Sequence, residues 1–403
     1  MNNEQNENQA FRGAIRAHGY MELDDEHTAV RGEAPRAAMI DHVPQTGDIP
    51  ETASPATPEQ LLARFQQDDP GATAQTAATQ EPDQAVVADK AIAVPSADVR
   101  LRSRDRVAEQ PSIGMRGFLR KLGFSMSPSA AEQEAADLGS ARSYVRLSTW
   151  RRSVGILVAN PKGGVGKTPL SLAIAGALAT TRGGGTIAFE VSDDPGALSV
   201  RAEGPASVGV AELLRDIDQV TGAGQLAGYV AKQTSYAAVI STVGDRDPLT
   251  GDDVRRMAKL TDTYYPVRVM DSGNVPSSDA FHGALDVTDV LVIPVLDALD
   301  ALQGAMQLLR HLHQLGGKYT ELARQAVVVR MHDGRPEDPE VRAYAEQLIT
   351  SAGISAVYEV PYDAHIAGRS TLSYSDLSAP TQKAITMLTA GIVGQLNKKL
   401  NQA

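Results

Sequence analysis

A glycine-rich segment between two regular elements carries the clearest chemistry in this sequence. Residues 154–169 read Val-Gly-Ile-Leu-Val-Ala-Asn-Pro-Lys-Gly-Gly-Val-Gly-Lys-Thr-Pro: an apolar run, a glycine-rich turn and the start of a helix. Because glycine lacks a Cβ, such a turn can wrap a polyphosphate and direct several backbone N–H groups at it. The helix that follows adds its own free amides. The residues expected to bind a nucleotide here are Gly163, Gly164, Val165, Gly166, Lys167, Thr168 and Pro169.

Two side chains at the end of this turn have specific expected roles. Lys167 would reach the β- and γ-phosphates of a nucleotide, and the Thr168 hydroxyl would bind Mg²⁺. The general phosphate-loop pattern begins with a glycine where this chain has Pro161. A glycine-rich turn that binds nothing is the alternative. The strand before the turn, the helix after it and its two lysines favour phosphate binding.

Two acidic segments follow predicted strands further along the chain. The first is Ser192-Asp193-Asp194-Pro195-Gly196, and because its residue types all favour turns, a plain turn stays open as an interpretation. The second is Asp271-Ser272-Gly273 after the apolar run 267–270. Asp271 would hold Mg²⁺, directly or through water, and the Gly273 amide would contact the γ-phosphate. An ionised aspartate at the end of a buried strand needs such a partner.

The segment Asn-Pro-Lys-Gly-Gly-Val-Gly-Lys-Thr, with Lys162 at the loop entrance, resembles the deviant P-loop of the ParA/MinD ATPases. The resemblance implies ATP and Mg²⁺ as ligands. It also implies a homodimer in the ATP state, in which Lys162 crosses to the nucleotide of the partner subunit. The second aspartate of the family's Asp-x-Asp-Pro pattern falls on Asp194, which would bind the metal and position the attacking water. The first aspartate falls on Ser192, or on Glu190 if this turn has one extra residue.

The resemblance therefore gives one set of catalytic residues and one of metal ligands. The catalytic set is Lys162, Lys167 and Asp194, and the metal set is Thr168, Asp194 and Asp271. Relatives often place an asparagine that reads adenine where this chain has Arg330. Arg330 would stack on the base, mark a base pocket that has been lost, or point to water. Pro361, in a segment that resembles the family's Pro-Tyr-Asp motif, would lie beside the base.

From residue 154 onward, apolar runs alternate with amphipathic segments, which predicts an α/β fold with a doubly wound, mostly parallel sheet of the P-loop NTPase type. Ligands of such sheets bind beyond the carboxyl ends of the strands. The predicted strands are 154–159, 186–191, 236–242, 266–271, 289–296, 325–330 and 356–360. The predicted helices are 167–181, 207–217, 250–261, 299–315, 338–352 and 379–399.

Composition divides the chain into three predicted parts. Residues 1–99 hold 6 basic and 17 acidic residues, which accounts for the whole net charge of -11, and their low content of large apolar residues predicts a disordered acidic tail. Residues 100–149 contain a basic amphipathic helix, which would dock on its own domain, a membrane, a partner or nucleic acid. Residues 150–403 form the ATPase domain. With no cysteine, disulfides and thiolate-bound metals are excluded.

These features predict a cytoplasmic, Mg·ATP-dependent molecular switch that dimerises, hydrolyses ATP slowly and positions or regulates a cargo. The expected partners are a protein of a partition or secretion system and, as open alternatives, DNA or a membrane surface. The switch would then lie at the inner face of the membrane or at the nucleoid. The layout of tail, basic helix and ATPase domain resembles the MinD-like proteins of actinobacterial type VII secretion loci. A nucleotide-binding scaffold with weakened turnover is the alternative, because Pro169, Ser192 and Arg330 depart from the family pattern.

Overall fold

The computed structural model describes residues 129–204 and 207–401. The predicted tail and the basic segment 100–128 lie outside the described residues. The strands are β1 Val154–Val158, β2 Thr186–Val191, β3 Ala231–Lys232, β4 Ala238–Ile240, β5 Val267–Ser272, β6 Val290–Val295, β7 Val327–Met331 and β8 Ala356–Val360. The longer helices are α3 Ala130–Leu147, α4 Lys167–Arg182, α8 Gly251–Asp262, α9 Asp279–Asp286, α10 Leu299–Leu315, α11 Gly317–Arg324, α12 Pro339–Ser351 and α14 Ala379–Asn401. Four short helices complete these elements: α5 Leu198–Arg201, α6 Val210–Asp216, α7 Ala223–Leu226 and α13 Ala364–Ala367.

The eight strands form one sheet in the order β3-β4-β2-β5-β1-β6-β7-β8. All neighbours pair in parallel except β3 and β4. The predicted mostly parallel, doubly wound fold is therefore confirmed. Strands β2, β5 and β1 are neighbours, so the segments that follow them in the sequence meet at one edge of the sheet.

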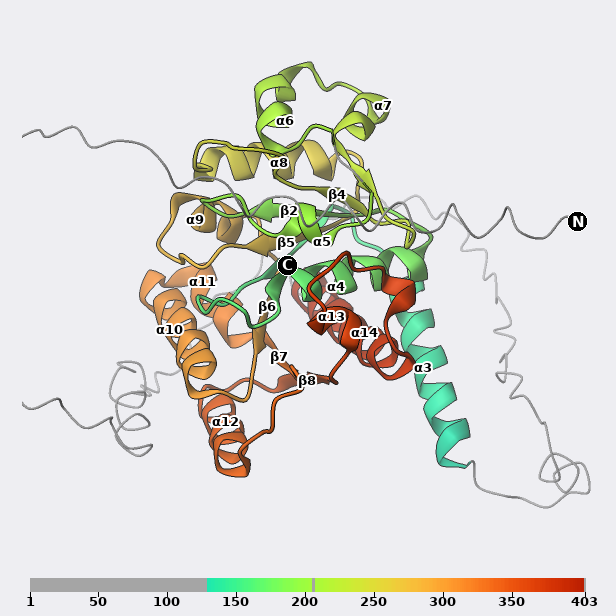
Figure 1. Cartoon of the computed structure of the whole chain (residues 1–403), viewed down its shortest axis with the longest axis vertical. Coiled ribbons are helices and arrows are strands. Elements are labelled where there is room, and N and C mark those ends of the chain that lie inside the picture. Colours follow the sequence, from blue (N-terminus) through green and yellow to red (C-terminus); the bar gives the residue numbers. More distant parts are fainter. Residues whose placement is uncertain (1–128, 205–206, 402–403) are drawn as a thin grey trace, which may run out of the picture. The chain divides into compact units, whose positions relative to one another are not determined.

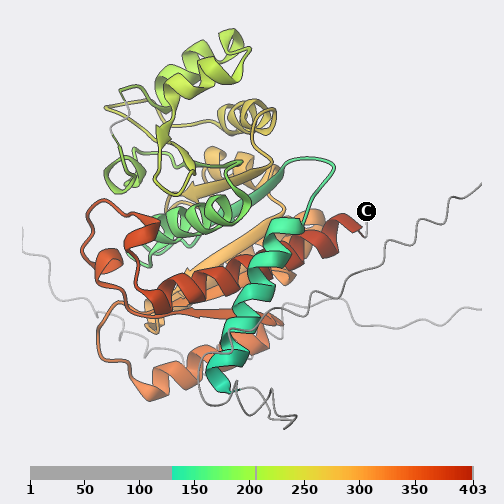
Figure 2. The same ribbon diagram turned by 90° about the vertical axis from the view of Figure 1, so that its right-hand side faces the viewer.

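Side chains alternate between two apolar cores, one on each face of the sheet. On one face, Ile156, Val269 and Val329 pack with α4 and α14. On the other, Phe189 and Val328 pack with helices that include α8 and α10. Figure 1 shows the two helical layers, and Figure 2 shows α3, α4 and α14 together on the first face. This alternation decides which face each polar residue at a strand end points to.

Local sequence explains where several elements begin and end. Helix α3 begins after Ser129, whose hydroxyl and backbone form a capping box with Glu132. Strand β4 begins at Ala238 rather than at the predicted residue 236, because Tyr236 has a φ of 69° in the turn that precedes it. The prediction missed α9 and α11 altogether, although their positions between strands fit the α/β pattern. None of the described helices combines the length and apolar composition needed to cross a membrane.

Candidate functional site

A cavity of about 780 Å³ opens at the carboxyl ends of β1, β2 and β5. The glycine-rich segment forms one wall, and every residue from Gly163 to Pro169 lines it. Gly164 has a φ of 80° and Gly166 a φ of 93°, which other residues rarely adopt, so both positions require glycine. Helix α4 begins directly after Gly166 with no side-chain cap, so its first amides stay available to an anion. Pro169 has no N–H and contributes only its ring to this wall.

The loop is fixed to the sheet by a side chain that precedes it. The Asn160 amide nitrogen donates to the carbonyl of Pro294 at 2.8 Å, and its oxygen accepts from the Lys162 N–H at 2.9 Å. Helix α10 approaches so closely that a Cβ on Gly304 would lie 2.8 Å from the Asn160 oxygen. The loop is therefore held in its curved form before any ligand binds.

Lys167 is buried at the base of this loop. Its Nζ donates to the carbonyl of Lys162 at 3.0 Å and to Oδ1 of Asn274 at 2.6 Å. Burial lowers the pKa of its ammonium to about 8, although the nearby Asp271 opposes this shift. Lys167 has no ion-pair partner in the described part of the chain, so its charge is free to serve an anionic ligand in the cavity.

Asp271 lies at the end of β5, on the face that α4 covers. Its Oδ2 accepts from the Thr168 hydroxyl at 2.7 Å, and its Oδ1 accepts from the Ser171 hydroxyl at 3.0 Å. Burial raises the pKa of its carboxyl to about 6, since these hydrogen bonds and Lys167 only partly offset the loss of solvent. The structure thus brings together Thr168, Asp271 and Lys167, as the sequence suggested.

Glu190 is a second carboxylate in the cavity. It pairs with Asp271 across the β2–β5 register and, by alternation from Ala188, points to the same face. Its Oε1 accepts from Thr242, Arg246 and the Gly196 amide, whereas its buried Oε2 has no partner. Glu190, rather than Ser192, therefore supplies the carboxylate at the end of β2.

The loop after β2 is held by one arginine. The side chain of Arg246 is only 2% exposed, and it forms an ion pair with Glu190 at 3.0 Å. It also donates to the backbone carbonyls of Ser192 at 2.7 Å and Asp193 at 2.6 Å. In this conformation the side chain of Asp194 is exposed and does not line the cavity, so its predicted role stays a prediction.

These donors fit a magnesium ion. Among the described residues, no three His, Cys, Asp or Glu side chains gather closely enough to hold a metal alone. Mg²⁺ suits such a site because it binds through one or two protein oxygens and completes its shell with phosphate oxygens and water. Thr168 and Asp271 would hold the ion, and the unpartnered oxygen of Glu190 would accept from its water shell. A bound cation would also favour the ionised form of Asp271.

Asp271 gives a testable dependence of stability on pH. Its folded pKa of about 6 lies above the ordinary value of 3.8, so the folded state holds more protons than the unfolded state between these values. The contribution of this group to the free energy of unfolding therefore falls as pH rises through this window. We expect the ligand-free Asp271→Asn variant to gain Tm relative to wild type as pH rises from about 4 to about 6. A constant difference in Tm across the window would contradict this account.

Of three other predicted site residues, two do not line the cavity. Lys162 lies outside it, where its Nζ pairs with Oδ2 of Asp300 on α10 at 2.7 Å. Pro361 directly follows β8, is half-buried, and is also absent from the wall of the cavity. Gly273 does line the cavity, and a Cβ there would lie 3.0 Å from Cβ of Ser192, so glycine allows the two loops to meet.

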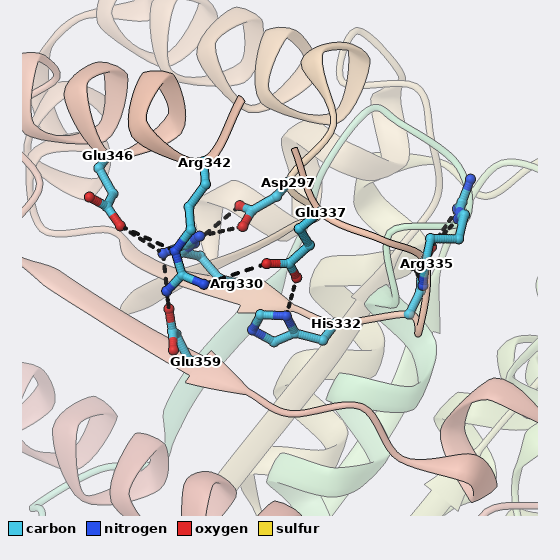
Figure 3. Close-up of polar contacts among 9 residues, drawn as sticks. Asp297, Arg330, His332, Arg335, Glu337, Arg342, Glu346 and Glu359 are labelled. Carbon is cyan, nitrogen blue, oxygen red and sulfur yellow. Dashed lines mark hydrogen bonds and ion pairs between the residues drawn. The ribbon is translucent and has the colours of Figure 1, made fainter. Parts of the chain in front are cut away.

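Arg330 neither lines the cavity nor points to water, as two of its three interpretations would require. By alternation from Val328, its side chain points to the face opposite α4, and it is buried among carboxylates rather than exposed to water. It pairs with Asp297, with Glu346 at 3.2 Å and with Glu359 at 2.9 Å (Figure 3). Arg330 therefore does not reach a base in this structure. The next residues, Met331, His332 and Asp333, line the cavity instead.

Sequence reasoning also missed several neighbours of the site. Asn274, which contacts Lys167, directly follows the predicted Asp-Ser-Gly segment and could have been found from that position. Ser171 lies one helical turn after Lys167, a spacing that places it on the same face of α4. No local sequence pattern indicates the role of Arg246, because it lies more than 50 residues from the loop that it holds.

The sheet and the glycine-rich loop together define the P-loop NTPase fold. Residues 156–371 match the family described as the CobQ/CobB/MinD/ParA nucleotide binding domain, and the chain belongs to this family. No curated protein matches the chain in sequence.

The fold is similar to that of a solved ParA family ATPase, and two MinD structures also match the chain. A ParA family ATPase from Chlorobium tepidum TLS is 14% identical, with a TM-score of 0.51, over 59% of this chain and 98% of that chain. The MinC:MinD cell division protein complex from Aquifex aeolicus is 16% identical, with a TM-score of 0.45, over 60% of this chain and 96% of that chain. The septum site-determining protein MinD complexed with Mg-ADP from Pyrococcus horikoshii OT3 is 13% identical, with a TM-score of 0.45, over 59% of this chain and 94% of that chain.

Proposed function

We propose that this protein is a Mg·ATP-dependent dimerising switch that hydrolyses ATP slowly to position or regulate a cargo. The observation that carries the proposal is the meeting, in one cavity, of the glycine-rich loop, the buried Lys167 and the hydroxyl–carboxylate pair of Thr168 and Asp271. Loop amides and Lys167 would bind the phosphates, and Thr168 with Asp271 would hold the Mg²⁺ that offsets charge on the γ-phosphate. Membership of a nucleotide-binding family supports this assignment.

The role of water positioning falls on two carboxylates in this proposal. The family resemblance assigns the positioning of the attacking water to Asp194. Because Asp194 lies in an exposed turn, this turn would have to close over the nucleotide first. Glu190 already lines the cavity, and its buried Oε2, which has no partner, would have to become accessible to accept from a water. We expect Glu190→Gln to retain ATP binding and to lower phosphate release, measured in a coupled assay with Asp194→Asn beside it. Wild-type turnover in both variants would contradict a role for either carboxylate.

Dimerisation would require Lys162 to leave Asp300. The pair is exposed on both sides, so it is weak and can exchange for a partner's nucleotide. Leu299, next to Asp300, and Val275, next to Asn274, are about half exposed, at 50% and 49%. Both side chains lie next to residues near the loop entrance, where a second copy would have to approach for Lys162 to reach its nucleotide.

The Lys162–Asp300 pair gives a prediction for assembly. Lys162→Ala should remain a monomer that still binds ATP, because the residue lies outside the cavity. Asp300→Ala should strengthen ATP-dependent dimerisation by about two- to fivefold, since it removes a weak competitor for the lysine. Light scattering after size-exclusion chromatography, with and without Mg·ATP, measures both. An ATP-dependent dimer of the Lys162→Ala variant would refute the proposed role of this lysine.

The exposed position of Asp194 favours one alternative, a nucleotide-binding scaffold that has lost turnover. Tight binding of Mg·ATP by the full chain, with no phosphate release even when candidate partners are present, would select the scaffold. Measurable hydrolysis that Lys167→Ala removes would select the switch.

The proposed cargo follows from the layout of the sequence. A partition complex and a secretion machine, including one of the type VII class, are the two candidates. Binding of the ATP-loaded protein to DNA and to anionic vesicles, with residues 1–124 present and deleted, separates a nucleoid site from a membrane site. Binding to neither would favour a protein partner.

A further inference from the structure

Arg201, the last residue of α5, lines the cavity and is only 5% exposed. Its Nη2 donates to the carbonyl of Ile366 at 3.1 Å. Its Nε and Nη1 are buried and have no hydrogen-bond partner. Leaving buried donors unpaired is costly, and a buried guanidinium is expected to have a counter-charge.

Unlike the other buried arginines, Arg201 lacks a carboxylate partner among the described residues. In the described part of the chain three arginines are buried as whole residues, and two of them have carboxylate partners: Arg268 pairs with Asp262, and Arg330 with Asp297. No carboxylate of the described residues pairs with Arg201. Burial lowers the pKa of its guanidinium, and the positive charge of Arg369 lowers it further. Arg201 is thus held in a positive environment without its own anion.

Arg369 adds a second positive charge to the same wall. It lines the cavity, is exposed, and follows α13 in a left-handed conformation with a φ of 52°. No hydrogen bond or ion pair holds its guanidinium to any described residue. The apolar side chains of Val200 and Ile366 flank the two arginines in the wall.

We propose that Arg201 and Arg369 form a second anion site in this cavity, one that takes a phosphate group other than the β- and γ-phosphates bound by the glycine-rich loop. Arginine suits this chemistry because its N–H groups match phosphate oxygens and its charge persists when buried. The phosphate would come either from the ribose side of the bound nucleotide or from a separate phosphorylated ligand. The first source rests on the nucleotide binding of the proposed function, whereas the second is independent of it.

Inorganic phosphate tests the site independently of the loop. In full-length protein with Lys167→Ala, which disables the loop, calorimetry should still detect phosphate binding. Adding Arg201→Gln should weaken that binding by about tenfold or more, the usual value of one charge-assisted hydrogen bond. Arg369→Gln should weaken it less, because this side chain is exposed. No binding to Lys167→Ala, or equal binding with and without Arg201→Gln, would overturn the proposal.

A second set of measurements identifies the source of the phosphate. If the nucleotide carries it, Arg201→Gln in the otherwise wild-type chain lowers affinity for AMP and ATP, and the ATP complex binds no further phosphate. If a separate ligand carries it, ATP affinity is unchanged, and the ATP complex of wild type binds phosphate while that of Arg201→Gln does not. A variant that matches wild type in every one of these titrations would sink the proposal.

Thermal unfolding separates this role from simple packing. Because the Arg201 charge has no partner in the protein, Arg201→Gln should leave the Tm of the ligand-free protein unchanged or raise it. Phosphate should raise the Tm of wild type and not that of the variant. A lower Tm with unaltered phosphate binding would instead assign Arg201 to packing.

Discussion

Lys167→Ala is expected to reduce ATP turnover by about a hundredfold or more, the usual effect of removing a group that stabilises charge in a transition state. Lys167 donates only to neutral oxygens in the ligand-free structure, and the nearby Asp271 offsets its charge only in part until phosphates arrive. ATP affinity should fall as well, because the bound phosphates would offset the cost of burying the ammonium. A coupled assay of phosphate release and calorimetry with Mg·ATP measure the two effects.

Stability provides the control for this variant. Burial lowers the pKa of Lys167 to about 8, which means that folding disfavours its charged form. The alanine variant should therefore unfold at the same temperature as wild type or higher in the absence of nucleotide. Mg·ATP should raise the Tm of wild type and leave that of the variant almost unchanged. Turnover equal to wild type in a folded variant would contradict the proposed function.

The sequence predicted the phosphate loop and the sheet because both depend on local patterns. The glycine spacing and the strand–turn–helix order are visible within the 16 residues 154–169. The site role of Asp271 could be predicted from its position at the end of one apolar strand. The position of Glu190 also follows from the sequence once alternation is counted along β2, since Ala188 and Glu190 must share a face. The family pattern alone left the first carboxylate at either Ser192 or Glu190.

Long-range pairs could not be predicted in this way. Arg201 looks like an ordinary arginine at a helix end, and only the packing of Ile366 over it shows that two of its nitrogens lack partners. Arg246 reaches a loop from a distant segment. The partners of Arg330 come from three separate elements, so neither its burial nor its direction could be read from β7 alone.

The Arg330 cluster positions the cavity wall without entering it. Arg330 joins Asp297, which precedes α10, to α12 and β8, while the adjacent Met331 faces the phosphate loop. A Cβ on Gly166 would lie 3.3 Å from Cε of Met331, so β7 and the loop are in close contact. The cluster therefore fixes one side of the nucleotide site through the backbone of β7.

Arg330→Ala is expected to lower the free energy of unfolding by about 3–5 kcal/mol, the usual cost of removing one partner of a buried ion pair. The side chain of Asp297 is 2% exposed and would be left without its cation. Arg342 is a matched control, because it also pairs with Glu346 and Glu359 but is 41% exposed (Figure 3). Arg342→Ala should cost no more than about 1 kcal/mol.

Urea denaturation of the two variants measures this difference directly. We expect the midpoint to shift far more for Arg330→Ala than for Arg342→Ala, with equal m-values if both unfold in one step. The double variant Arg330→Ala/Asp297→Leu should recover part of the loss, since it removes the orphaned charge and replaces it with an apolar side chain. Equal effects of the two single variants would show that burial does not decide the contribution of this cluster.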